Sequence, residues 1–273
     1  MEQSPEAAIH ITYREDAAPF AMNLHHHTSH ELILVTAGRV RFHVADREYE
    51  ASAGDLLVIS NLEPHDVEVL EWPYHRFFVS IAPATLQDAL REPELETLFR
   101  HRPDAFRHLI RLSAPEQNQA EATLSAMARE QADRRPFWEG SLEMALRGFL
   151  ITLYRSHAAS FPQLALSAAA RTMLEVQRYI DGHDTEDLRL SEVARRFHVD
   201  MYHLSHTFHR TTGYSFKEYL VRCRVNRAAD QLRSTADSVS QIASACGFNS
   251  APHFIRTFRR ITGITPLQYR KKA

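Results

Sequence analysis

The sequence has only two cysteines, Cys223 and Cys246, and they form no CxxC pattern. Two cysteines without this spacing argue against a disulfide scaffold and against a structural zinc site, and they fit a reducing cytosol. No run of about 18 apolar residues occurs, so no membrane span is predicted. The amino terminus, MEQSPEAAIH, lacks the basic start and apolar stretch of a signal peptide. We therefore expect a cytoplasmic protein that makes no membrane contact.

The chain has little net charge, −2, but the charge is divided unevenly along its 273 residues. Residues 168–273 hold 17 basic and 10 acidic residues, a net of +7, whereas the first 167 residues carry −9. A basic segment joined to an acidic one indicates that only one end meets a polyanion. A solvated helical surface would explain the same charge, so charge alone leaves both interpretations open. The length is sufficient for two domains.

The last third of the chain contains a repeated pattern. LSEVARRFHVDMYHLSHTFHRTTGYSFKEYL, from Leu190, is followed by VSQIASACGFNSAPHFIRTFRRITGITPLQYR, from Val239. Beyond the turn, residues recur with an offset of 50: His203, Thr207, Phe208, Arg210, Thr212, Gly213 and Tyr219 become His253, Thr257, Phe258, Arg260, Thr262, Gly263 and Tyr269. A repeat that preserves a helix–turn–helix pattern is typical of a paired DNA-reading module.

In the first copy, Ser191 is predicted to cap the first helix and Asp200 the second, which ends at Gly213. Apolar residues four apart predict the buried side of the second helix in each copy: Leu204 with Phe208, and Phe254 with Phe258. The opposite side of the first copy's second helix then holds the residues able to meet base edges. These residues are Tyr202, Ser205, His206 and His209.

In the second copy, Ser240 is predicted to cap the first helix, and either Asn249 or Ser250 the second. The outward-facing residues of that second helix are then Ala251, His253 and Arg256. Arg256 is the strongest single candidate for reading a base, because a guanidinium group donates two hydrogen bonds to guanine O6 and N7. The alternative is a surface arginine without such a role.

Residues 171–271 resemble the DNA-binding region of the AraC/XylS family of bacterial transcription regulators. The resemblance rests on the stretches LSHTFHRTTGYSFKEYL, RVNRAADQL and IASACGFNSAPHFIRTFRRITGITPLQYR. It implies two helix–turn–helix motifs joined by one long helix, about residues 215–234, and two recognition helices that enter neighbouring major-groove segments. The family's base-reading positions fall on Tyr202, Ser205, His206, Ala251, His253 and Arg256.

The first motif departs from the family pattern, because serine and histidine stand where longer Gln or Arg side chains are common. This departure favours a positioning role for the first motif, through phosphate contacts helped by Arg210 and Lys217. His209 and the capping Ser250 complete the set of candidate DNA-binding residues.

The first half of the chain predicts a β domain followed by helices. Residues 1–20 read as an arm, and residues 21–84 carry six short β-branched and aromatic runs, which predict a small barrel or jelly roll. Residues 85–157 read as helical. The apolar stripe within 138–155 either packs against its own barrel or forms a dimer seam, and one stripe could do both. Residues 158–168 are the expected linker to the DNA-binding domain at 169–273.

A histidine-rich motif lies near the start of the β domain. His25, His27, Glu31 and Gly38 follow the spacing H-x-H-x3-E-x6-G, which resembles the first cupin signature, and GDLLVISNLEPH, ending at His65, resembles the second. On an extended strand His25, His27 and Glu31 would point inward, and the intervening His26 and His30 outward. With His65, such residues could bind a divalent transition metal. Contact with an organic effector and a structural role are the alternatives.

The segment EWPYHRFF places two further residues at candidate ligand positions. It resembles the strand that lines the sugar pocket in arabinose-sensing members of the family, which makes His75 and Phe77 candidate effector contacts. The arginine that those members carry near the position of Ala37 is absent, so arabinose itself is not implied.

Together these features predict an α+β two-domain regulator. A cupin-like barrel would sense a sugar or another small metabolite, a helical segment would form a homodimer, and an all-α domain with two helix–turn–helix motifs would bind promoter DNA. Activation is the family tendency and brings in RNA polymerase as a partner; no cofactor and no catalytic residue are predicted. Two alternatives stay open: a cupin metalloenzyme that uses His25, His27, Glu31 and His65, and a DNA-binding protein whose barrel only dimerises.

Overall fold

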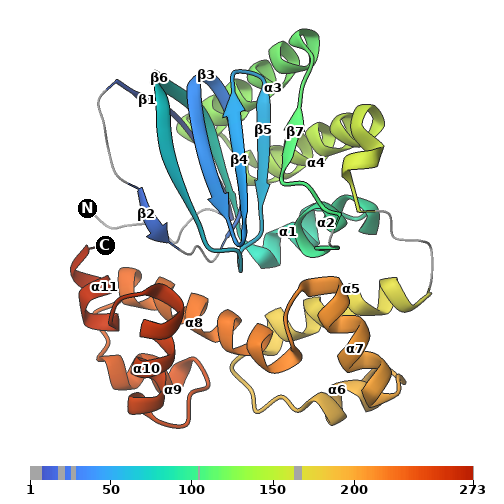
Figure 1. The fold of residues 1–273 in the computed structure, drawn as a ribbon, viewed down its shortest axis with the longest axis vertical. Coiled ribbons are helices and arrows are strands. Elements are labelled where there is room, and N and C mark those ends of the chain that lie inside the picture. Colours follow the sequence, from blue (N-terminus) through green and yellow to red (C-terminus); the bar gives the residue numbers. More distant parts are fainter. Residues whose placement is uncertain (1–7, 18–21, 26–28, 104, 163–167, 273) are drawn as a thin grey trace. The chain divides into compact units, whose positions relative to one another are not determined.

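The computed structural model describes residues 8–17, 22–25, 29–103, 105–162 and 168–272. These residues form two compact units that divide between residues 162 and 168 (Figure 1). The first unit is an antiparallel sheet with helices, and the second is entirely helical. This arrangement confirms the predicted α+β fold with two domains. None of the described helices has the length and apolarity that a bilayer crossing needs.

The sheet of the first unit has the strand order β1-β6-β3-β5-β7, with β2 paired to β6 and β4 paired to β3. All these pairings are antiparallel, which short connections along the chain allow. The strands are β1 Ile9–Asp16, β2 Met22–His25, β3 His30–Val44, β4 Arg47–Ser52, β5 Asp55–Ile59, β6 His65–Ile81 and β7 Leu109–Arg111.

Two long strands replace four of the predicted short ones. The sequence predicts a break at Gly38, but β3 continues through it, with shifts of register against β6 on either side. Gly38 has φ 82°, and a Cβ there would lie 2.4 Å from the carbonyl oxygen of Pro73 on β6. Glycine is therefore required where the two strands bulge toward each other, and it bends the strand without ending it.

Two segments differ from the predicted domain boundaries. Residues 9–16, predicted as part of an arm, form β1, which pairs with β6 from Ile9 opposite Ile81 to Asp16 opposite Tyr74. In β1 only Ile9 and Ile11 are buried, and this alternation is too short to stand out against the flanking residues. The segment predicted as helical also contains one strand, β7, which adds to β5.

The sheet separates two hydrophobic clusters. Leu32 and Leu34 of β3 face the helices, whereas Ile33 and Val35 face the inner side of the curved sheet. Side chains of a strand alternate between faces, so each face is apolar here and both are covered. The helices of this unit are α1 Pro83–Ala89, α2 Pro93–Arg100, α3 Ala114–Asp133 and α4 Trp138–His157, followed by the 3-10 turn η1 Ala158–Ser160.

The apolar stripe of α4 packs against its own domain. Leu142, Leu146, Phe149, Leu150 and Leu153 are all buried in the cluster on the helix side of the sheet. The first of the two predicted roles for this stripe is therefore the one that the structure shows.

The second unit has two helix–turn–helix pairs joined by one long helix, as predicted (Figure 1). The long helix α8 begins after Ser215, whose hydroxyl accepts a hydrogen bond from the backbone nitrogen of Glu218, and it ends at Ser234. The helices are α5 Ala168–His183, α6 Leu190–Arg196, α7 Met201–Thr212, α8 Phe216–Ser234, α9 Val239–Ala245, α10 Ala251–Thr262 and α11 Pro266–Lys272.

One cross-strand pair makes the stability of the sheet depend on pH. The Nδ1 atom of His43 on β3 lies 2.6 Å from Asp66 Oδ1 on β6, and its Nε2 atom lies 3.3 Å from Glu48 Oε2. The hydrogen bond to Asp66 raises the pKa of His43 above its ordinary 6.5, against a small opposing effect of burial. A pKa that is higher in the folded state means that the stabilisation is fully present below about pH 6.5 and is lost as pH rises through the folded value.

We therefore expect Asp66→Asn to lower the free energy of unfolding by about 0.5 kcal/mol near pH 6, and by much less near pH 9, since exposed pairs contribute little. Urea unfolding of the wild type and the variant at both pH values measures this difference. An equal cost at both pH values would contradict the assignment.

Candidate DNA interface and effector site

The recognition helix of the first motif, α7, has the boundaries and the exposed side that the sequence predicts. The carboxylate of Asp200 accepts a hydrogen bond of 3.0 Å from the backbone nitrogen of His203, and the helix ends at Gly213, which has φ 77°. Leu204 and Phe208 are fully buried. The predicted reading residues are all exposed: Tyr202, Ser205, His206 and His209.

The recognition helix of the second motif, α10, has the same design. Ser250 caps it, with its hydroxyl 3.4 Å from the backbone nitrogen of His253, and Phe254 and Phe258 are fully buried. Arg256 and His253 are exposed, and Ala251 is half-buried. The side chains predicted to read bases are therefore accessible on α10. Their contact with DNA remains a prediction.

Two predicted caps on the preceding helices were wrong. Ser191 lies inside α6, which begins after Arg189. In the second copy Ser238, and not Ser240, caps α9. Its hydroxyl accepts a hydrogen bond of 3.2 Å from the backbone nitrogen of Gln241, whose side chain accepts one of 2.8 Å from the backbone of Ser238. This reciprocal capping box needs Gln or Glu three residues on, and Ser240 has Ala243 there.

Further cations lie beside the predicted DNA-binding residues. Arg210 and Lys217, predicted to contact phosphates, are both exposed. Other exposed arginines at the ends of α6 and α10 were not predicted, namely Arg195, Arg196 and Arg259. All three lie in the last turn of a helix, where basic residues stabilise the carboxyl end. The predicted helix ends would therefore have indicated them.

Two arginines of α8 tie the two motifs together. Arg224 donates to the carbonyl oxygens of Asp184 and Glu186, at 2.7 and 2.6 Å. Arg227 pairs with the buried carboxylate of Asp184, with an Nη2–Oδ1 distance of 2.7 Å. The residue between those carbonyls, Thr185, lies against the turn of the second motif, where a Cβ on Gly247 would be 2.6 Å from its oxygen. The loop that leads to the first motif therefore contacts the turn of the second.

In the first unit the structure brings together two of the predicted effector residues. Glu31 on β3 and His65 on β6 are both buried, and Glu31 Oε2 lies 3.2 Å from His65 Nε2. Burial lowers the pKa of His65, but the hydrogen bond and charge of Glu31 outweigh it and raise that pKa overall. A buried imidazole beside a carboxylate can exchange one hydrogen bond for another, which suits contact with a hydroxyl-bearing ligand.

The other histidines of the motif are placed differently. The backbone of His25 pairs with His65 across β2 and β6, and its side chain and the whole of His26 and His27 lie outside the described residues. His30 lies on the outer face, as its parity predicts, but it is 1% exposed and packs on Phe99 of α2. The outer face at this point is therefore core and not surface.

His75 and Phe77 lie apart from the Glu31–His65 pair. Phe77 belongs to the cluster on the helix side of the sheet, with its ring 4.7 Å from that of Tyr13, and His75 is half-buried with its ring 6.4 Å from the same tyrosine. Glu31 shares the parity of the inner-facing Ile33. The predicted effector residues are thus divided between two faces.

A buried polar network centres on Glu63 and was not predicted from the sequence. Glu63 accepts hydrogen bonds from Arg102 Nε at 2.6 Å and from His108 Nε2 at 3.0 Å, and His108 Nδ1 lies 2.9 Å from the hydroxyl of Tyr49. Burial alone would raise the pKa of Glu63, but Arg102 and His108 outweigh it and lower that pKa. These residues come from separate segments of the chain, so no spacing in the sequence could have indicated the network.

Within the described part of the chain, no group of three or more His, Cys, Asp or Glu side chains is placed to hold a metal ion. Of the four residues named for a metal, only Glu31 and His65 have described side chains, and they form an ion pair with each other.

Two family models match the chain. One, described as an AraC-like ligand binding domain, matches residues 9–132, and the other, described as a helix-turn-helix domain, matches residues 193–272. The chain belongs to the AraC family of transcriptional regulators. The two matches fall on the sheet unit and on the helical unit, so both halves carry AraC-family features.

Curated relatives match part of the chain. The bifunctional transcriptional activator/DNA repair enzyme AdaA of Bacillus subtilis is 35% identical over 96 residues, which is 35% of this chain and 46% of that protein. The regulatory protein PocR of Salmonella typhimurium is 33% identical over 100 residues, 37% of this chain and 33% of that protein. The chain thus spans less than half the length of these relatives.

The solved structures extend the likeness to both units. A single-substitution variant of ToxT from Vibrio cholerae, in its apo form, has a TM-score of 0.64 at 12% identity, covering 98% of this chain and 99% of that one. ToxT with an unsaturated fatty acid bound has a TM-score of 0.60 at 14% identity, covering 96% and 94%. At this identity the likeness shows the shared fold alone.

Proposed function

We propose that this AraC-family protein is a sequence-specific DNA-binding transcription regulator controlled by a small-molecule effector. The observation that carries the proposal is the pair of capped recognition helices, α7 and α10, each with a buried apolar side and an exposed side of polar and basic residues. A helix with this division can pack on its own domain and enter the major groove at the same time.

The two recognition helices have different chemistry. The exposed side of α10 carries three arginines, Arg256, Arg259 and Arg260, whereas that of α7 carries one, Arg210, beside Tyr202, Ser205 and His206. Arginine both attracts phosphates and recognises guanine through two hydrogen bonds. We infer that α10 specifies the sequence and that α7 chiefly aligns the protein on the DNA backbone.

The sheet unit is the proposed sensor. Its match to a ligand-binding family model and the buried Glu31–His65 pair support a polar small molecule, a sugar or another metabolite, as the effector. ToxT, which shares the fold, has been crystallised with an unsaturated fatty acid, so this fold can hold an organic molecule. An effector acts only through different affinities for two states of the regulator.

The proposed homodimer would use the exposed side of α4. Phe137, immediately before the helix, is 90% exposed, and Met144 is 72% exposed. Large apolar side chains this accessible favour a contact with another protein surface. Activation of transcription through RNA polymerase completes the proposal and follows the family tendency.

Arg256→Ala should cost about 1–3 kcal/mol of binding free energy on the cognate site and relax the preference at one base pair. Arg259→Ala, one turn further along α10, is the matched control, and we expect it to weaken binding to all sequences equally. Fluorescence anisotropy on the cognate duplex and on single-base variants measures both. A loss for Arg256→Ala that is the same on every duplex would make Arg256 a phosphate contact.

The alternative in which the sheet unit only dimerises the protein predicts no effector. A thermal-shift screen of sugars and other small metabolites against the full chain separates the two, since a ligand that binds the folded state raises its apparent stability. A hit that also changes DNA affinity supports the sensor; a hit that leaves DNA affinity unchanged supports binding without regulation.

A further inference from the structure

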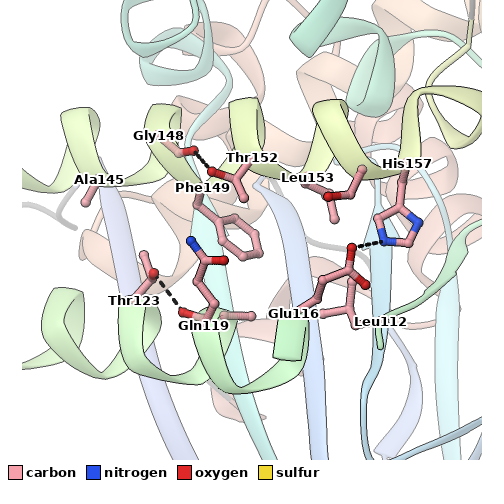
Figure 2. Close-up of a pocket in the computed structure, with 12 residues that line it drawn as sticks. Leu112, Glu116, Gln119, Thr123, Ala145, Gly148, Phe149, Thr152, Leu153 and His157 are labelled. Atoms are coloured by element: carbon pink, nitrogen blue, oxygen red, sulfur yellow. Dashed lines mark hydrogen bonds and ion pairs between the residues drawn. The ribbon is translucent and has the colours of Figure 1, made fainter. Parts of the chain in front are cut away.

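Helices α3 and α4 flank a half-open pocket of about 360 Å³ that contains none of the predicted effector residues (Figure 2). It lies between the first half of α3 and the second half of α4. Its floor is apolar and is formed by Ala120, Phe149 and Leu153. Polar side chains surround that floor: Glu116, Gln119, Thr123, Thr152, Ser156 and His157. The volume suits a small organic molecule.

The hydroxyl groups of this pocket present acceptors to a ligand. Thr123 donates its proton to the carbonyl oxygen of Gln119 at 2.9 Å, and Thr152 donates to that of Gly148 at 3.0 Å, as the dashed lines in Figure 2 show. A hydroxyl has one proton to give, so both oxygens offer only lone pairs to the space between the helices. The Ser156 hydroxyl donates its hydrogen bond to the Glu116 carboxylate.

A carboxylate closes one end of the pocket. Glu116 Oε2 accepts hydrogen bonds of 2.7 Å from the hydroxyl and the backbone nitrogen of Ser113, and Oε1 lies 3.2 Å from His157 Nε2 (Figure 2). The bonds from Ser113 lower the pKa of Glu116 to about 2, so the group is ionised at any physiological pH. The two bonds from Ser113, with Ser156 and His157, fill the four lone-pair sites of the carboxylate, so a bound ammonium group would take the place of the exposed Ser156 hydroxyl.

We propose that the α3–α4 pocket binds a small organic cation: an ammonium group on an aromatic body of about a dozen non-hydrogen atoms. The ammonium hydrogens would meet the Glu116 carboxylate and the threonine oxygens, and the aromatic body would lie on Phe149 and Leu153. A carboxylate ligand would meet a like charge and a row of acceptors. The inference rests on this helix pair alone and does not depend on the proposed binding of DNA.

Isothermal titration of the full chain with three indoles of matched size tests the ligand class. Tryptamine carries a cation, tryptophol a neutral hydroxyl and indole-3-acetate an anion on the same ring. We expect tryptamine to bind about tenfold more tightly than tryptophol, because charge-assisted hydrogen bonds are the stronger ones, and indole-3-acetate to bind most weakly. No heat with tryptamine, or the reverse order, would overturn the proposal.

Two leucine substitutions in α4 locate the site. Gly148 and Gly140 are both exposed, and a Cβ at either would meet nothing within 4 Å. Leucine is also the better helix former, so we expect neither substitution to destabilise the fold. Gly148 lines the pocket and Gly140 does not. Gly148→Leu should abolish tryptamine binding and Gly140→Leu should preserve it, with neither variant less stable than the wild type. Equal binding by both would place the amine elsewhere and refute the site.

Glu116→Gln isolates the charge. Glutamine keeps the capping box with Ser113, so α3 should remain intact. We expect about a tenfold loss of affinity for tryptamine and no change for tryptophol.

Sedimentation of the same variants tests the other occupant, a second copy of the chain. If Gly148→Leu dissociates a dimer and no indole binds the wild type, the pocket is an interface between two copies and the proposal is wrong.

Discussion

Raising the salt concentration from about 50 to about 200 mM is expected to weaken binding to promoter DNA about a thousandfold. Each arginine or lysine that neutralises a phosphate releases a condensed counterion, and returning that ion at high salt opposes binding. The helical unit has a net charge of +7. Its exposed cations near the recognition helices include Arg195, Arg196, Arg210, Lys217, Arg256, Arg259 and Arg260. About six phosphate contacts from this set would give a loss of that size.

The slope of log affinity against log salt measures the number of contacts directly. The double variant Arg210→Gln, Lys217→Gln should lower that slope by about two, because each contact contributes about 0.9. Arg111→Gln on β7 is the matched control: its side chain is 80% exposed, and it belongs to the acidic unit, where no phosphate contact is proposed. A flat response of the wild type to salt would contradict the DNA-binding function.

The helical unit was predictable because its signals are local. Helix caps, apolar residues four apart and the glycine after each recognition helix all lie within a few residues of the structure they determine. Asp200, Gly213 and the buried Phe254 were therefore predicted correctly. The error at Ser240 has the same origin, since two serines two residues apart both satisfy a simple capping rule. Only the reciprocal partner, Gln241, decides between them.

The sheet unit was less predictable because its decisive contacts join distant segments. Gly38 was interpreted as the end of a strand, but the carbonyl of Pro73, far along the chain, makes it a bulge. The Glu63 network and the division of the effector candidates between two faces depend in the same way on register, which no single segment contains. The pocket between α3 and α4 likewise combines residues of two helices that pack side by side.

Gly247→Ala is expected to lower the free energy of unfolding of the helical unit by about 3 kcal/mol. Gly247 has φ 75°, where a side chain costs energy in any surroundings, and its Cβ would lie 2.6 Å from the carbonyl oxygen of Thr185. That oxygen cannot move away easily, because Arg224 holds the carbonyls of Asp184 and Glu186 on either side of it.

Two other positions separate the contributions to this cost. Gly213 has φ 77° but a Cβ there would meet nothing within 4 Å, so Gly213→Ala should cost only about 1 kcal/mol. The first motif has His198, with φ 54°, at the turn position that Gly247 occupies in the second, so His198→Gly should stabilise by about 1 kcal/mol. Urea unfolding followed by helical circular dichroism gives all three values.

Equal costs for Gly247→Ala and Gly213→Ala would show that Thr185 moves away from the new methyl group. A larger cost at Gly247 would show that the contact with Thr185 holds the second turn rigidly against the loop of the first motif, which fixes the spacing at which the two recognition helices meet DNA.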